Sequence, residues 1–205
     1  MRTATILITV LLLGAPAWIA AQAAPPATGA PEVFNATANA KNASGAMSGT
    51  LEVRVSRYTP DFDRKTVEEA LRLGGYPRFV TTLRNAPEVG QLVLGGGQPY
   101  AIRYARVKVE AGNRTIVVVT DRPVFFVSGG RAADTKPRAG YEVAVVEIRL
   151  DGTGQGRGTM AAAARVRPDG DGGVLLDDYA EQPITLTNVV RQPMVAAPPA
   201  SAPSR

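Results

Sequence analysis

Apolar and polar residues alternate with a period of two along several short stretches of this chain, a pattern typical of half-buried β-strands. The cleanest example covers residues 50–58, where Leu51, Val53 and Val55 alternate with polar or charged residues. The strand signals resume at Leu92 and predict strands over residues 100–109, 115–120, 124–127, 141–150, 157–167, 174–179 and 184–190. Because turns rich in glycine separate these segments, we expect a predominantly antiparallel sheet.

The alternation slips by one residue in two of the expected strands. One slip lies near Ala105-Arg106 and the other between Val145 and Val146. A β-bulge adds one residue to one strand and shifts its phase, so we expect a bulge near Ala105-Arg106.

The first expected strand ends at Thr59-Pro60-Asp61, and a helical pattern follows it. Gly74-Gly75 ends this helix, and a second short helix is expected over residues 77–83. These segments predict a helical hairpin inserted after the first strand. The fold class we expect is α+β, with the antiparallel sheet arranged as a meander, a partly closed barrel or a sandwich.

The two ends of the chain have a different composition from its centre. Arg2, an apolar run over residues 6–17 and Ala21-Gln22-Ala23 form the pattern of a secretory signal peptide with cleavage near Ala23. The apolar run is too short for a stable membrane-spanning helix. We therefore expect residues 1–23 to be a signal peptide that directs the protein to the periplasm or the outside of the cell. Residues 24–31 are expected to be a flexible leader, residues 32–191 one folded domain and residues 192–205 a disordered tail.

The absence of cysteine and histidine narrows the chemistry that the chain can perform. Ser-His-Asp and Cys-His catalysis and the usual zinc sites require these residues. Carboxylate pairs, a Ser-Lys arrangement and an oxygen-ligand Ca²⁺ site are the alternatives that remain. The Ca²⁺ alternative rests on four acids, Asp169, Asp171, Asp177 and Asp178, but Ala180 stands where an EF-hand loop has its last glutamate ligand. We expect no metal or cofactor.

Arginine dominates the basic residues, and the formal charge is +5, or +4 once Arg2 leaves with the signal peptide. Arg103 and Arg106 flank Tyr104 and are candidates for an anion-binding surface, since guanidinium groups match carboxylate and phosphate oxygens. The alternative is that they face solvent opposite acids such as Glu147 on adjacent strands.

A second candidate site follows an expected strand at Thr120-Asp121-Arg122-Pro123. Asp121 could be a catalytic or ligand-binding carboxylate with Arg122 as its electrostatic partner. The alternative is that Asp121 hydrogen-bonds the amides of a turn.

The glycine-rich stretch over residues 152–158 resembles a phosphate-binding loop only superficially. A dinucleotide-binding loop must open a helix, whereas a strand pattern follows this one, and the Gly-Lys-Ser/Thr of a P-loop is missing. We interpret the stretch as a hairpin turn.

Residues 49–190 resemble a group of exported bacterial proteins of uncharacterised activity. The likeness rests on the strand and helix pair, Arg103-Tyr104, the segment 120–123, the segment 147–151 and the glycine turn at 154–158. The resemblance implies an exported domain and assigns no activity or ligand to any residue.

Three functions remain open. The first is a non-enzymatic exported domain that binds an envelope component, for example an anionic one, or a protein partner, with Arg103, Tyr104, Arg106, Asp121 and Arg122 as candidate binding residues. The second is a hydrolase that uses carboxylates, and the third is a structural protein of the cell envelope tethered by its proline-rich ends. We favour binding, and we expect no nucleic-acid partner. Two or more acids that converge in a concave site would favour the hydrolase.

Overall fold

The computed structural model describes residues 31–193, except 43–44, 128–130, 134–137 and 171–172. The predicted signal peptide, nearly all of the predicted leader and the chain beyond residue 193 lie outside the described residues. The last strand includes Gln192 and Pro193, which pair with the first strand.

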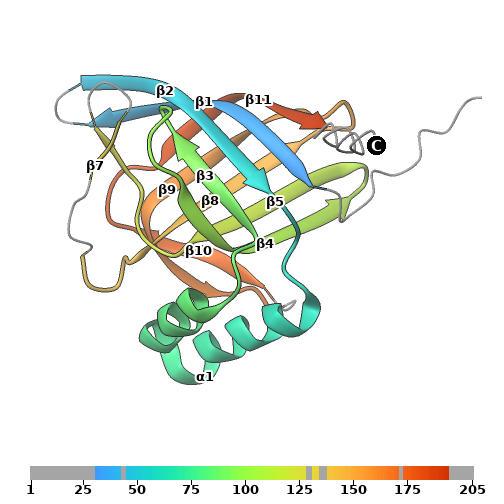
Figure 1. Cartoon of the computed structure of the whole chain (residues 1–205), viewed down its shortest axis with the longest axis vertical. Helices are drawn as coiled ribbons and strands as arrows, with labels where there is room; N and C mark the ends of the chain where they lie inside the picture. Colours follow the sequence, from blue (N-terminus) through green and yellow to red (C-terminus); the bar gives the residue numbers. More distant parts are fainter. Residues whose placement is uncertain (1–30, 43–44, 128–130, 134–137, 171–172, 194–205) are drawn as a thin grey trace, which may run out of the picture.

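Eight of the described strands form a closed antiparallel barrel in which each strand pairs with the next one along the chain (Figure 1). These strands are β1 (Glu32–Asn42), β2 (Gly45–Val55), β3 (Gly90–Leu94), β4 (Tyr100–Glu110), β5 (Asn113–Thr120), β8 (Val143–Leu150), β9 (Gln155–Pro168) and β11 (Ile184–Pro193). Strand β11 pairs with both β9 and β1, which closes the sheet. The expected α+β class with a predominantly antiparallel sheet is confirmed.

Three shorter strands lie outside this ring. Strands β6 (Phe125–Val127) and β7 (Arg131–Ala133) pair only with each other among the described residues. Strand β10 (Val174–Tyr179) pairs with the last third of β9, past the point where β8 begins. The β9–β10 hairpin therefore extends past the barrel wall on the side where the helix lies (Figure 1).

The strand β1 was not predicted from the sequence. Its inward residues after Phe34 are Ala36 and Ala38, and alanine gives a weak hydrophobic alternation. The expected first strand is therefore the second, and the helical segment follows β2 rather than the first strand.

Helix α1 (Asp61–Asn85) begins after Pro60, ends before Ala86 and contains one break. Gly75 has φ 67°, a left-handed conformation that glycine adopts readily, so the helix is divided into two segments there. In the described part of the chain, no helix has the length and apolar character needed to cross a membrane.

The apolar residues form two cores on opposite faces of the barrel wall. The barrel interior is filled by residues such as Phe34, Ile102 and Leu186. On the outer face, Phe79 and Leu83 of α1 pack in a second cluster with residues of β4, β5, β8, β9 and β10. The helix thus covers the part of the outer surface that these five strands form.

Register shifts between strands lie close to the predicted slips in alternation. Strand β4 shifts against β5 between Ile102 and Tyr104, and β8 shifts against β9 between Val143 and Val145. The first shift turns Tyr104 into the helix-covered core, where its side chain has no exposed surface.

The glycine-rich stretch is a hairpin turn that continues into β9, as the sequence predicted. A β-carbon on Gly156 would overlap the carbonyl oxygen of Arg149, and one on Gly158 would overlap that of Glu147. The glycines in the strand thus permit β9 to approach β8 closely.

Candidate functional site

The structure separates the five candidate binding residues into three places. Arg106 lines a groove on the outer surface of the barrel, and Tyr104 is buried under helix α1. Arg103 and Asp121 form an ion pair where the end of β5 meets β4, with Arg122 beside them. The five residues therefore do not form one site.

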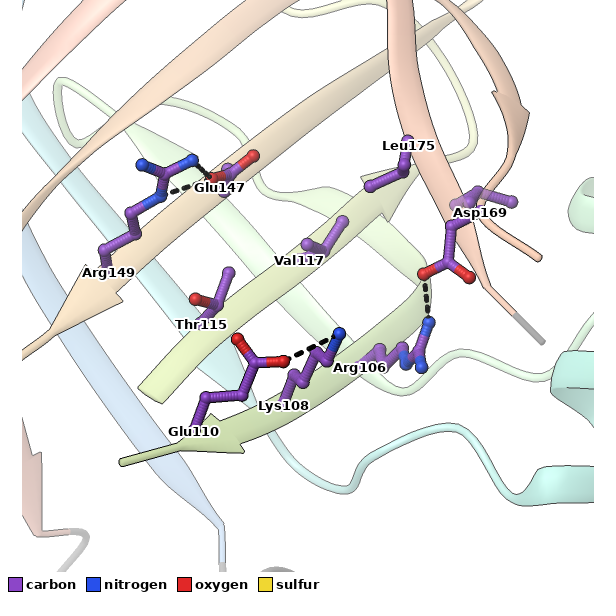
Figure 2. A pocket seen from close by; sticks show the side chains of 10 residues that line it. Arg106, Lys108, Glu110, Thr115, Val117, Glu147, Arg149, Asp169 and Leu175 are labelled. Carbon is purple, nitrogen blue, oxygen red and sulfur yellow. Dashed lines mark hydrogen bonds and ion pairs between the residues drawn. The ribbon is translucent and has the colours of Figure 1, made fainter. Parts of the chain in front are cut away.

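The groove is a cavity of about 480 Å³ on the outer face of β4, β5 and β8. Figure 2 shows the side chains of these three strands side by side, with Asp169 and Leu175 of the β9–β10 hairpin at one end. Its ten lining residues are Arg106, Lys108, Glu110, Thr115, Val117, Glu147, Arg149, Asp169, Val174 and Leu175.

Strand register explains why these residues meet. Arg106 is paired with Val117, and Val117 with Glu147, so the three form one outward row across the sheet. Lys108, Thr115 and Arg149 form the next row in the same way. Residues that are directly opposite on adjacent strands have β-carbons about 5 Å apart, close enough to interact.

Each carboxylate of the groove has a cation beside it. Lys108 Nζ lies 2.9 Å from Glu110 Oε1, and Arg149 Nη2 lies 2.6 Å from Glu147 Oε1. These two pairs join residues two apart on a single strand, and both lysine and arginine are exposed.

The third pair joins two elements of the fold. Arg106 of β4 donates to Asp169, which begins the β9–β10 turn, and both side chains are mostly buried. A β-carbon on Gly173 would overlap the Arg106 guanidinium, so a larger residue there would displace this side chain. The pair fixes the hairpin against the barrel wall and closes one end of the groove. The alternative from the sequence placed Glu147 opposite Arg106 on an adjacent strand. Val117 of β5 lies between the two residues instead, and Glu147 forms its ion pair with Arg149.

Two of the four acids considered for Ca²⁺ accept hydrogen bonds from other side chains, and Asp177 is exposed on β10. Asp169 accepts from Arg106, and Asp178 Oδ2 accepts from the Tyr141 hydroxyl at 2.6 Å. Asp171 lies outside the described residues. Within the described segments, no three acidic side chains are grouped closely enough to hold a metal ion.

The second candidate region surrounds Asp121. Its carboxylate lies 3.6 Å from Arg103 Nε, and its backbone oxygen accepts from Arg84 Nε of α1 at 3.1 Å. The neighbouring Arg122 instead donates to the Pro99 oxygen at 3.4 Å, with its guanidinium 4.8 Å from the centre of the Tyr100 ring. The cation beside the Asp121 carboxylate is therefore Arg103 rather than the expected Arg122.

A buried ionic cluster at one end of the barrel interior was not predicted. The Glu32 carboxylate accepts two hydrogen bonds from Arg114, at 2.9 and 3.0 Å, and a further one from the Tyr58 hydroxyl. Arg191 Nε lies 2.6 Å from the same carboxylate. Because Glu32 and Arg114 are 82 residues apart and β1 itself was not predicted, no local pattern indicated this cluster.

The surroundings of Glu32 favour its charged form. Burial alone would raise the pKa of the Glu32 carboxyl, but hydrogen bonds from Arg114 and Tyr58 and the charges of both arginines hold this pKa below its ordinary value. Burial and the bond to Glu32 raise the pKa of the Tyr58 hydroxyl, so it stays protonated and donates. The cluster joins β1, β5 and β11 at one end of the barrel, so we interpret it as structural.

No family model, curated protein or solved structure matches this chain. The resemblance to exported bacterial proteins therefore stays a prediction, and only the geometry of the site bears on function.

Proposed function

We propose that this protein is an exported, non-enzymatic binding protein and that its ligand lies in the groove on β4, β5 and β8. The observation that supports this proposal is the pairing of every carboxylate in the groove with a cation. A general acid or base must be able to reach a proton on the substrate, and a nucleophilic carboxylate must reach its carbon. Carboxylates that are held by arginine or lysine are better suited to hydrogen bonding with a ligand.

The balance of charge indicates the kind of ligand. Three cations and three carboxylates line the groove, so Glu110 and Glu147 would repel a polyanion that approached Lys108 and Arg149. Val117, Val174 and Leu175 add apolar surface between them. An extended peptide segment with charges of both signs and an apolar side chain fits this combination. Its charged groups can form ion pairs with Lys108, Glu110, Glu147 and Arg149 in place of the pairs within the groove.

Fluorescence anisotropy with three labelled peptides of equal length tests this proposal. One peptide combines lysine, glutamate and leucine, one is rich in glutamate, and one contains only serine and glycine. We expect saturable binding of the first peptide alone, weakened by added salt because exposed charges are screened. Saturable binding of none of them would overturn the proposal.

Two matched variants locate the binding site. Val117→Arg places a bulky cation in the groove and should abolish binding. Val93→Arg changes a half-exposed residue of β3 outside the groove and should leave binding unchanged. An equal loss in both variants would contradict the assignment to the groove. Mass spectrometry of the peptide after incubation should show the intact mass, whereas cleavage would favour the hydrolase alternative.

Export is a separate part of the proposal, and it is supported by the sequence pattern of residues 1–23 alone. Expression of the full chain in a bacterial host, followed by fractionation and intact-mass measurement, tests it. We expect a mature protein that begins near Ala24 in the periplasmic or extracellular fraction. A full-length protein retained in the cytoplasm would contradict export without affecting the groove.

A further inference from the structure

Three elements bring arginines and one acid together at the end of the barrel next to helix α1. Arg84 comes from the last turn of α1, Arg103 from β4, and Asp121 and Arg122 from the segment after β5. Glu88, the acid nearest to Arg84 in the sequence, accepts a hydrogen bond from Gln91 at 3.1 Å. Among the described residues, only Arg103 of these three arginines has a carboxylate beside it, that of Asp121, which leaves an excess of positive charge.

The hydrogen bonds of Arg103 are incomplete. Its Nη1 donates to the Ala86 oxygen at 3.0 Å, which fixes the guanidinium against the end of α1. Its Nε is buried and has no hydrogen-bond acceptor among the described residues, because Asp121 Oδ2 at 3.6 Å is too distant. The Nε is therefore closed to a ligand, and a ligand can meet only the exposed part of the Arg103 side chain, which is 25% of its surface.

The backbone around Asp121 is held in place by the barrel. The Asp121 amide donates to the Ala101 oxygen at 3.2 Å, and the Thr120 hydroxyl donates to the Arg122 oxygen at 2.6 Å. The exposed Arg84 reaches this segment from the helix through its bond to the Asp121 oxygen. The positions of Arg84 and Arg103 are thus set by bonds to backbone oxygens, so little ordering is needed for a ligand to bind.

We propose that Arg84 and Arg103 form a binding site for one oxyanion group, such as a phosphate, sulfate or carboxylate. The oxyanion would accept from the remaining Nη donors of Arg103 and from the remaining donors of Arg84, in the manner typical of guanidinium groups. Arg122 lies beside the site, with its guanidinium directed to Pro99 and Tyr100. This site is separate from the groove and does not depend on the proposed peptide ligand.

NMR of the ¹⁵N-labelled protein provides the test, with the arginine Nε–Hε signals followed during titration with inorganic phosphate at constant ionic strength. We expect a saturable shift of the Arg103 and Arg84 signals. Arg84→Ala should weaken phosphate binding about tenfold, the effect of losing one charge-assisted hydrogen bond. Asp121→Asn should tighten binding, because it removes the carboxylate that competes for Arg103.

Two control variants remove the same charge elsewhere. Arg72→Ala changes an exposed residue of the same helix, and Arg122→Ala changes the arginine that faces away from the site. Both should bind phosphate within about twofold of the unchanged protein, because they leave the hydrogen bonds to the anion intact. Equal weakening by Arg84→Ala and Arg72→Ala, or no saturable shift of Arg103, would overturn the proposal.

A second experiment distinguishes a free anion from the phosphate headgroup of a lipid. Vesicles of phosphatidylglycerol are compared with vesicles of phosphatidylcholine in a sedimentation assay. Binding to phosphatidylglycerol that is lost in Arg84→Ala identifies a membrane-borne phosphate as the ligand, whereas phosphate binding without vesicle binding identifies a free anion. Either result supports the site. The phosphate titration and the vesicle assay do not depend on the groove, so a failure of the proposed peptide binding would not change either result.

Discussion

Arg114 donates two parallel hydrogen bonds to the carboxylate of Glu32, at 2.9 and 3.0 Å, inside one end of the barrel. Glu32 begins β1 and Arg114 lies near the start of β5, and their side chains are 1% and 6% exposed. Because the pair is buried, loss of one partner would leave the other charged in a poorly solvated place.

Glu32→Gln should therefore destabilise the protein strongly. The change leaves Arg114 and Arg191 without their carboxylate, and the expected loss in the free energy of unfolding is about 3 kcal/mol. Urea unfolding followed by circular dichroism measures it. Glu52→Gln, which removes an exposed ion pair with Arg54, should cost less than about 1 kcal/mol. Similar losses in both variants would mean that the Glu32 cluster contributes no special stability.

The same carboxylate should make stability depend on pH. The folded pKa of Glu32 lies below its ordinary value of 4.5, so its contribution is fully present above pH 4.5 and is lost as the pH falls through the folded pKa. The urea midpoint of the unchanged protein should fall in this acid range more steeply than that of Glu32→Gln. Parallel pH profiles would contradict the prediction.

Gly156→Ala should destabilise the barrel because the new methyl group would overlap the Arg149 carbonyl oxygen. Overpacking against backbone costs about 1–3 kcal/mol. Gly152→Ala is the matched control, since open space surrounds that position. Thermal unfolding of the two variants provides the comparison, and an unchanged melting temperature in Gly156→Ala would show that β8 and β9 can separate without cost.

Phe79→Ala should show how much the helix-covered core contributes to stability. Phe79 has no exposed surface, and loss of such a ring costs about 3–5 kcal/mol. Phe62, on the same helix, is 80% exposed, so Phe62→Ala should change the free energy of unfolding by less than about 0.5 kcal/mol. Guanidinium unfolding measures both. A small loss in Phe79→Ala would mean that α1 is only weakly attached to the barrel.

Local sequence patterns predicted many elements because they depend on neighbouring residues. The alternation of Leu51, Val53 and Val55 predicted the buried face of β2, and the hairpin turn before β9 followed from its glycines. The slip in alternation near Ala105-Arg106 lies within a few residues of the register shift after Ile102. The strand β1 was missed because its inward residues Ala36 and Ala38 differ little in hydrophobicity from their polar neighbours, which leaves no clear alternation.

The candidate site was less predictable. Arg103, Tyr104 and Arg106 are close in sequence, but the register shift and the alternation of side chains direct them to three different surroundings. The partner of Arg106 is Asp169, 63 residues away, and the partner of Arg103 is Asp121. Charges find partners across strands, and strand pairing is a non-local property.

The sequence by itself determined the antiparallel β-rich class, the turns and the lack of cysteine and histidine chemistry, because each of these follows from residue types and short-range periodicity. Only the tertiary structure decided that the sheet closes through β11 and β1, and that Glu32 meets Arg114 inside it. It also decided which charges share the groove. These features arise when distant segments are brought together by burial of the two cores, whose cooperative packing has no counterpart in any local pattern.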